Sequence, residues 1–373
     1  MGLFRNRAQR LIALSLTTSL AISGTAYGIV SIDDTDLVEG ENSVGGGTAT
    51  YGDSLLDMID VTADKLTCDE DLTINFNGGN DIEHTQVTGD ANVTLNFNGD
   101  NEVEDIEAYD NSDLTVNVNE HNDFEDIEAY DSSKLTVKVN GEAEVEAIKG
   151  YDDASVTVTG TNCPRKDVLE LGEGEDSERI GTERGALTIK DVTIVMDSEL
   201  AQVLSQSGDV SITCSKISAG DNNKKTDIIV GGKLFVGGSV IDVKGTMGVD
   251  GALTIRRSDV DMTKPEGEDS PYRIWSKTGI ELIEEKNGEV KEGTLNGVKV
   301  HFVDTGDGED VHLKSALTPC YYRSCDDNKE LPKTGGKVLA KTGDASGIVS
   351  ALALLAAGMT SVAAGFFSKR HMD

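Results

Sequence analysis

Carboxylates recur every 21 residues in the first half of the chain, and they are the side chains that could do chemistry. One column consists of Glu83, Glu104, Glu125 and Glu146. A second column consists of Asp110, Asp131 and Asp152. Rows of carboxylate oxygens suit Ca²⁺, which tolerates varied coordination geometry. We therefore weigh two hypotheses: these acids bind Ca²⁺ or another ligand, or they face solvent and keep the protein soluble.

A sequence repeat must position these columns. Its units begin at Leu72, Val93, Leu114, Leu135 and Val156. Each unit opens with alternating apolar and polar residues, which is typical of a half-buried strand. Asn, Gly and Asp between the strands favour turns. Self-similarity at this period predicts a stacked fold, so we expect an all-β parallel β-solenoid (a β-helix) built on 21-residue coils.

Stacking turns each repeated position into a ladder with a spacing of ~4.8 Å. Like charges at that distance repel by about 0.9 kcal/mol in water. The column Tyr109, Tyr130 and Tyr151 either offers a stacking face to sugars or packs inward beside a turn. An asparagine column, expected to satisfy turn backbone groups, consists of Asn77, Asn98, Asn119 and Asn140. A threonine row on one outer face consists of Thr73, Thr94, Thr115, Thr136 and Thr157.

The repeat loosens further along the chain. Similar segments begin at Leu187, Val210, Leu234 and Leu253. We predict a solenoid over residues 51–262, with regular repeats over 72–159, an inserted loop over 160–184 and irregular coils over 185–262. Residues 29–50 are polar and glycine-rich, and we expect a flexible segment there. Residues 263–318 contain Tyr272, Trp275 and Phe302 and alternate apolar and polar side chains over 298–303, which favours a β-rich cap over the open end of the solenoid.

The N-terminus has the pattern of a secretory signal peptide. Three arginines precede the short apolar stretch 11–22, and small residues follow at Ala26 and Gly28. This order of a basic head, an apolar middle and a small-residue exit is typical of such peptides. We predict that residues 1–28 are removed by cleavage after Gly28, with cleavage after Ala26 as the alternative.

The C-terminus combines a short motif with an apolar run. The motif consists of Leu331, Pro332, Lys333, Thr334 and Gly335. We expect a linker over 319–344, a single apolar helix over 345–368 and a basic cytoplasmic tail over 369–373. About 20 apolar residues at ~1.5 Å rise are long enough to cross a ~30 Å hydrocarbon core.

This tail resembles the cell-wall sorting signal of Gram-positive surface proteins. The resemblance implies that a membrane sortase cleaves the Thr334–Gly335 bond and joins Thr334 to peptidoglycan, so this chain is a substrate of that reaction. A second motif with Ala in place of Pro consists of Leu339, Ala340, Lys341, Thr342 and Gly343. The implied location is outside the cell, covalently attached to the Gram-positive cell wall. The implied partners are sortase and peptidoglycan.

The charge and the remaining motifs narrow the function. A net charge of −34 repels nucleic acid. No catalytic residues are predicted, so we expect a non-enzymatic adhesin, a carbohydrate-binding protein or a structural surface protein that contacts an extracellular glycan or a host or microbial surface. No cofactor is predicted apart from possible Ca²⁺. The alternative is a lyase-like polysaccharide-degrading β-helix enzyme with its site near Arg256 and Arg257.

Five cysteines fit an extracellular location, where disulfides persist. Cys320 and Cys325 are close enough in sequence to form a small loop just before the sorting motif. The other three are Cys68, Cys163 and Cys214. An odd number leaves at least one cysteine unpaired within the chain, and the sequence leaves the connectivity open.

Overall fold

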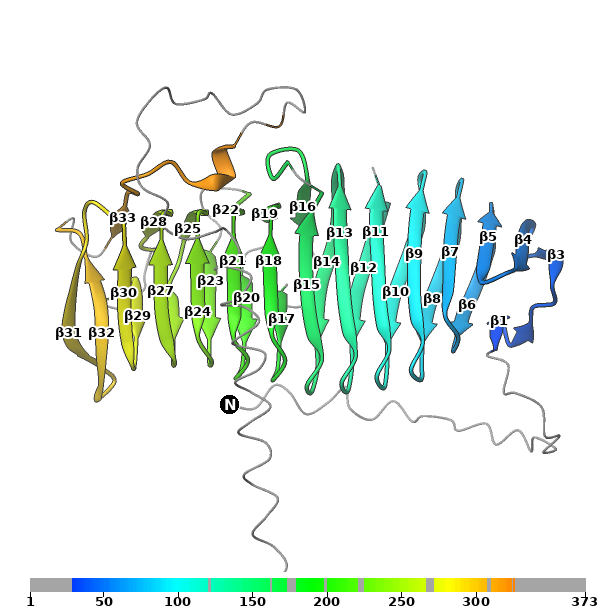
Figure 1. Ribbon diagram of the computed structural model, residues 1–373, viewed down its shortest axis with the longest axis horizontal. Coiled ribbons are helices and arrows are strands. Elements are labelled where there is room, and N and C mark those ends of the chain that lie inside the picture. Colours follow the sequence, from blue (N-terminus) through cyan, green and yellow to red (C-terminus); the bar gives the residue numbers. More distant parts are fainter. Residues whose placement is uncertain are drawn as a thin grey trace, which may run out of the picture. The chain divides into compact units, whose positions relative to one another are not determined.

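Two long β-sheets wind around a common core (Figure 1). A computed structural model describes residues 29–325, apart from residues 120–121, 162, 173–178, 198–199, 221–224, 266–271, 307–309 and 324. Within these residues the chain forms a 13-stranded sheet, a 20-stranded sheet and the 3-10 turn η1 (Cys320–Tyr322). From β5 to β30 every neighbouring pair in the first sheet is parallel. The fold is therefore an all-β parallel solenoid, as predicted.

The 13-stranded sheet contributes one strand to each coil. In chain order its strands are β3 (Gly40–Val44), β4 (Gly47–Gly52), β5 (Leu55–Ile59), β7 (Leu72–Asn77), β9 (Asn92–Asn98), β11 (Asp113–Asn119), β13 (Lys134–Asn140), β15 (Ser155–Gly160), β18 (Leu187–Lys190), β21 (Val210–Thr213), β24 (Leu234–Gly237), β27 (Ala252–Arg256) and β30 (Gly279–Ile283).

The 20-stranded sheet begins with one strand per coil and continues with two. Its early strands are β1 (Val30–Ile32), β2 (Thr35–Asp36), β6 (Thr62–Cys68), β8 (Asp81–Val87), β10 (Glu102–Ala108), β12 (Asn122–Ala129) and β14 (Glu142–Gly150). The later strands are β16 (Val168–Leu171), β17 (Arg179–Thr182), β19 (Thr193–Met196), β20 (Leu200–Ser205), β22 (Lys216–Ala219), β23 (Lys225–Val230), β25 (Val240–Lys244), β26 (Met247–Val249), β28 (Asp259–Thr263), β29 (Ile274–Ser276), β31 (Glu289–Leu295), β32 (Val298–Asp304) and β33 (Val311–Leu313). β14 pairs with β16 through its first half and with β17 near its end, so each coil has three faces from there on.

The strand register matches the sequence repeat. Leu72 lies beside Val93, and the same column continues through Leu114, Leu135 and Val156. The looser units also align, because Leu187, Val210, Leu234 and Leu253 form one column. Both the 21-residue repeat and its irregular continuation are confirmed.

Alternation along the strands builds the core. β7 alternates buried and half-buried residues from Leu72 to Asn77, and its buried side chains meet those of the other sheet. Inside successive coils Phe76 stacks on Phe97 with ring centroids 4.4 Å apart, and Phe97 meets Phe124 edge to face with centroids 5.0 Å apart. Burying such a side chain stabilises the fold by about 1.5–3 kcal/mol.

Three predicted boundaries need correction. Residues 29–50, expected to be a flexible segment, contain four strands, because β1 pairs with β6 and the β3–β4 hairpin pairs with β5. Residues 160–184, expected to be an inserted loop, contain β16 and β17, which continue the second sheet. Within 263–318, β29 and β30 still add in parallel to the preceding coil, and only β31–β33 pair in the antiparallel sense.

Candidate functional site

The predicted glutamate column lies where the second sheet bends. Glu83, Glu104 and Glu125 are exposed, and Glu146 is half-buried. In the pairing of β8, β10, β12 and β14, the residues on either side of these glutamates are paired across strands, but the glutamates themselves are not. The inside–outside alternation is interrupted at the same place, because positions 104 and 105 both face outward. An edge of exposed carboxylates fits the solvent-facing hypothesis.

The predicted aspartate column occupies a turn. Asp110, Asp131 and Asp152 have φ angles of 61°, 59° and 53°, the left-handed region that aspartate tolerates better than most residues. The Asp110 carboxylate accepts a hydrogen bond from the backbone N–H of Gly89 at 3.0 Å. The Asp131 carboxylate accepts one from the N–H of Asp110 at 3.3 Å. These aspartates therefore connect successive turns.

The structure does not bring the two predicted columns together, because five residues of the chain lie between Glu104 and Asp110. The described part of the chain contains no group of three or more His, Cys, Asp or Glu side chains arranged to hold a metal ion. Ca²⁺ binding stays a prediction, and the geometry of these two columns does not add to it.

A different set of acids is clustered on the outer face of the second sheet. Asp105 lies beside Asp126, and Glu107 lies beside Glu128, in neighbouring strands. This pair of columns was not predicted, although the sequence contains the alternation that places them on one face. In Asp105-Ile106-Glu107-Ala108-Tyr109 the buried residues alternate with outward ones, so Asp105, Glu107 and Tyr109 share one face.

Basic or amide groups flank this acidic cluster at both ends. His84 Nδ1 lies 3.0 Å from an Asp105 oxygen, and Gln86 donates a hydrogen bond of 2.6 Å to Glu107. At the other end Lys149 Nζ lies 2.8 Å from Asp126 and 3.3 Å from Glu128. Only 15% of the Lys149 side chain is exposed. The cluster is thus a partly desolvated ion-pair network that spans four coils.

The same burial shifts the acidity of the network. Desolvation raises the pKa of Asp105 to about 6, His84 opposes this shift, and the nearby carboxylates of Glu107, Asp126 and Glu128 add to it. Burial also raises the pKa of Tyr109 and Tyr130 above the usual range for tyrosine, and the adjacent glutamates add to that shift.

The tyrosine column is a continuous ring stack. The centroid distance is 4.7 Å from Tyr109 to Tyr130 and 4.8 Å from Tyr130 to Tyr151, with interplanar angles of 6° and 11°. The hydroxyl of Tyr109 donates to Glu107 at 2.9 Å, and that of Tyr151 donates to Glu128 at 3.1 Å. The rings are half-buried beside the turn. Because the rings cover one another's faces, this column has little aromatic surface left for a sugar.

The described surface has a small notch beside the tyrosine column and a larger groove near the last coil. A notch of about 20 Å³ beside Gly181 is bounded by Lys149, Tyr151 and Leu204. A void of that size holds about one water molecule and is too small for a sugar ring. A groove of about 490 Å³ lies near the last coil, and its lining includes Lys314 and Asp259, whose charged groups are 3.9 Å apart.

The predicted basic residues of the lyase alternative are engaged by an acid. The Arg256 guanidinium lies 3.9 Å from a carboxylate oxygen of Glu284. The Arg257 guanidinium donates bidentate hydrogen bonds to the same carboxylate. This ion pair lowers the pKa of Glu284 and raises that of Arg257.

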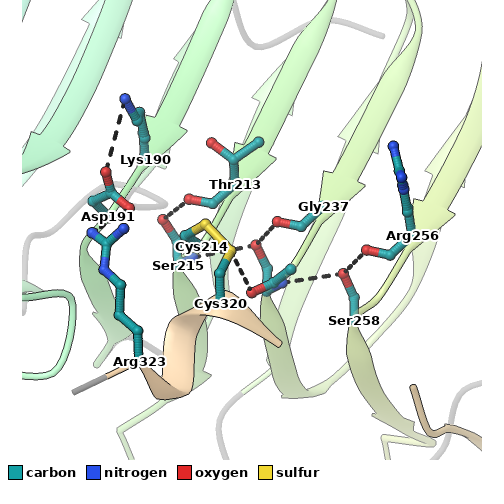
Figure 2. Close-up of a disulfide and its surroundings, with 12 residues drawn as sticks. Lys190, Asp191, Thr213, Cys214, Ser215, Gly237, Arg256, Ser258, Cys320 and Arg323 are labelled. Atoms are coloured by element: carbon teal, nitrogen blue, oxygen red, sulfur yellow. Dashed lines mark hydrogen bonds and ion pairs between the residues drawn. A yellow bond between two sulfur atoms is a disulfide. The ribbon is translucent and has the colours of Figure 1, made fainter. Parts of the chain in front are cut away.

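The C-terminal end of the described chain runs back along the solenoid as a strap, which we define as residues 314–325. The strap lies against the corner at which β18, β21, β24 and β27 of the first sheet turn into the second sheet (Figure 2). The N–H of Ser315 donates to Asp259, and the N–H of Tyr321 donates to the carbonyl of Gly238 at 3.0 Å. The guanidinium of Arg323 lies 2.8 Å from Asp191. The strap therefore crosses successively earlier coils.

Two disulfides fix the strap. Cys320 is bonded to Cys214, and Cys325 is bonded to Cys163. The Cys320–Cys325 loop, one of the pairings that the sequence left open, is therefore absent, because each of these cysteines is bonded to a cysteine of a different coil. Among the described residues Cys68 is free and buried, and desolvation raises the pKa of its thiol to about 11. The prediction of an unpaired cysteine is confirmed.

The predicted processing sites lie outside the described residues. These sites are Gly28, both sortase motifs and the apolar run over 345–368. In the part of the chain that the structure does describe, no helix is long and apolar enough to cross a membrane.

Comparison with protein-family models, with curated proteins and with solved structures gives no match to this chain.

Proposed function

We propose that this chain is a non-catalytic surface protein that is exported, cleaved by sortase and linked to the peptidoglycan of a Gram-positive cell wall. The signal-peptide pattern over 1–28 and the motif over 331–335 support this proposal. The two disulfides support it as well, because such bonds persist in oxidising surroundings outside the cell.

The sorting motif over 331–335 is the observation that carries the proposal, and the strap determines where such an anchor would act on the solenoid. The last cysteine of the strap, Cys325, is bonded to Cys163 in the flank of the solenoid, and the sorting motif begins six residues later in the sequence. A wall bond at Thr334 would be nine residues from Cys325, which is at most about 30 Å of extended chain. A pull from the wall would thus reach the solenoid at Cys163, through the Cys163–Cys325 disulfide.

A role in adhesion or surface structure agrees with the chemistry of the described faces. The clustered carboxylates are engaged by Lys149, Gln86 and tyrosine hydroxyls, which is an arrangement that stabilises the stack. A solenoid of this kind presents long, regular faces to a partner. We therefore favour binding or structural support over catalysis.

Wall fractionation tests the proposal. The full chain is produced in a Gram-positive host that has sortase, and muramidase-released wall protein is probed by immunoblot. We expect the protein in this fraction and expect Thr334→Ala to shift it to the membrane fraction. Thr342→Ala is the matched control at the second motif and should leave wall attachment intact. Attachment that survives both single changes and the double change would sink the proposal.

Calcium dependence is a separate prediction with its own test. If the exposed glutamate edge binds Ca²⁺, the melting temperature of the full chain should rise in Ca²⁺ relative to chelator. Glu104→Gln combined with Glu125→Gln should remove that rise. Equal melting temperatures in Ca²⁺ and in chelator would contradict Ca²⁺ binding by these glutamates.

A further inference from the structure

Across β7, β9, β11, β13 and β15, the outer face of the 13-stranded sheet is almost free of charge, although it belongs to the most acidic coils. We call this surface the neutral face. Its residues are Thr73, Asn75, Thr94, Asn96, Thr115, Asn117, Thr136, Lys138, Thr157 and Thr159. Lys138 is its one charged member. Asp113 and Lys134 lie at its edge and approach each other to 3.8 Å. The acids of these coils are thus concentrated on the other sheet and at the turns.

The neutral face is a preorganised hydrogen-bonding surface. Asn75 donates to Asp57 at 2.7 Å, Asn96 donates to Asn75 at 2.8 Å and Asn117 donates to Asn96 at 2.7 Å. These bonds hold the amides in one orientation, and the threonine row runs beside them in register. Side chains that are already ordered lose little entropy on binding. The remaining hydroxyl and amide groups can both donate and accept hydrogen bonds.

An aromatic ring continues the threonine row. Thr157, Thr188, Ser211 and Phe235 are successive partners in the same sheet. Phe235 is 37% exposed. Its ring lies over Gly237, where a Cβ atom would be only 2.5 Å from the ring. The missing side chain at Gly237 therefore lets the ring lie down on the sheet, with apolar surface toward solvent, unlike the mutually covered tyrosine rings.

We infer that the neutral face binds a neutral, hydroxyl-rich polysaccharide that lies along the solenoid axis, with Phe235 stacking on a sugar ring. From Thr73 to Phe235 the row crosses seven coil steps, which is about 34 Å at ~4.8 Å each. The net charge of −34 disfavours anionic polymers. A hydroxyl-rich chain matches the paired donors and acceptors and pays no such electrostatic penalty. This inference rests on the proposed surface role and names its ligand class.

Affinity electrophoresis of the purified full chain tests the inference. The gels contain xyloglucan, mixed-linkage β-glucan, mannan or starch as neutral probes, and polygalacturonate as the anionic probe. We expect retardation by at least one neutral probe and none by polygalacturonate. Phe235→Ala should weaken binding about tenfold, the factor that corresponds to 1.4 kcal/mol. Thr94→Glu combined with Thr136→Glu, which places two charges on the face, should weaken it at least as much.

A matched control adds the same charge elsewhere. Thr62→Glu combined with Ser132→Glu changes two exposed positions away from the neutral face. Binding should remain within twofold of the unchanged chain, and melting curves check that every variant folds. The inference is overturned if no neutral probe retards the chain, if polygalacturonate does so equally, or if the face variants bind like the control. These assays do not depend on anchoring, so a failed wall-fractionation test would leave this result interpretable.

Discussion

The first and second halves of the solenoid build the same corner in different ways. Between β7 and β8 two residues separate Asn77 from Asn80, and Gly78 takes the left-handed conformation with φ of 92°. Between β21 and β22 one residue, Cys214, separates Thr213 from Ser215 and has φ of 51°. The position that follows each turn is buried in both halves, as Asn80 and Asn101 in one and as Ser215, Ser239 and Ser258 in the other.

Side-chain length explains the exchange of asparagine for serine. After the longer turn, the amide of Asn80 reaches the carbonyl of Asn77 at 3.3 Å and the side chain of Asn101 at 2.8 Å. After the shorter turn, the Ser215 hydroxyl donates to the nearer carbonyl of Thr213 at 2.9 Å. Its backbone N–H donates to the Ser239 hydroxyl at 3.2 Å. In the later half the strap also crosses this corner. Ladders of repeated side chains therefore stabilise the first half, and the two strap disulfides reinforce the second.

Removing a strap disulfide should give the largest effect and should be confined to the second half. Cys214→Ser with Cys320→Ser opens a loop with a sequence separation of 106, which corresponds to about 4–5 kcal/mol of unfolding free energy. Denaturant melts with limited proteolysis would locate the loss. Adding reductant to a variant that lacks both disulfides is the control and should change nothing. Equal loosening of both halves would contradict the comparison.

Breaking the ion-pair network should affect the first half. Lys149→Met keeps much of the side-chain volume and leaves Asp126 and Glu128 without their cation, so we expect a loss of about 2–3 kcal/mol, near the lower limit for buried pairs. Lys134→Met removes an exposed pair at 3.8 Å and should cost less than about 1 kcal/mol. Similar losses in the two variants, measured by urea unfolding, would argue against a desolvated network.

The buried asparagine ladder should be more sensitive than the exposed one. Asn101, 3% exposed, accepts hydrogen bonds from the backbone and side chain of Asn80. Asn101→Ala leaves those buried donors without an acceptor, and we expect a loss of about 1–3 kcal/mol. Asn98→Ala, in the exposed ladder, should stay within about 0.5 kcal/mol. Thermal melts of the two variants compare them directly, and an equal effect would show that burial does not decide the contribution.

The last expected effect is a pH dependence from Asp105, whose exposed part is screened by solvent. Its pKa is raised in the folded state to about 6, above the usual value of 3.8, so the folded protein retains a proton that the unfolded chain has already lost. This contribution to stability is complete at pH below 3.8 and is lost as pH rises to about 6. Asp105→Asn should remove that part of the pH profile. Melting temperatures at pH 4, 5, 6 and 7 test this, and identical profiles for the two proteins would contradict it.

The sequence predicted what depends on repetition. Strand alternation from Leu72 onward gave the solenoid, and the column from Leu187 to Leu253 gave its irregular continuation. Period-two alternation carries this information because it directly reflects which face is buried. The column through Asn77 and Asn98 was expected to satisfy backbone groups of the turn, but the Asn98 amide donates to the Asn77 side chain at 3.3 Å. The buried Asn80 bonds the turn backbone instead, at the N–H of Val61 and the carbonyl of Asn77.

The remaining features depend on distant contacts. Whether Cys320 pairs with Cys325 or with Cys214 is decided by the direction in which the strap runs, which no local pattern encodes. Asp105 belongs to the ion-pair network and Glu104 does not, because the inside–outside alternation of the strand is interrupted between them. A shift of this interruption by one residue would exchange the inward and outward positions, and the sequence pattern does not locate it. The strands over 29–50 form because the first coil offers an open edge with which they pair.

Hydrogen exchange measured by mass spectrometry tests the central claim, that ladders hold the first half and the strap holds the second. The full chain is compared before and after disulfide reduction, through peptides that cover β7–β13 and β18–β27. We predict that protection falls in β18–β27 after reduction and stays unchanged in β7–β13, because local stability follows local constraints. A uniform loss across both regions, or unchanged protection in β18–β27, would contradict the account.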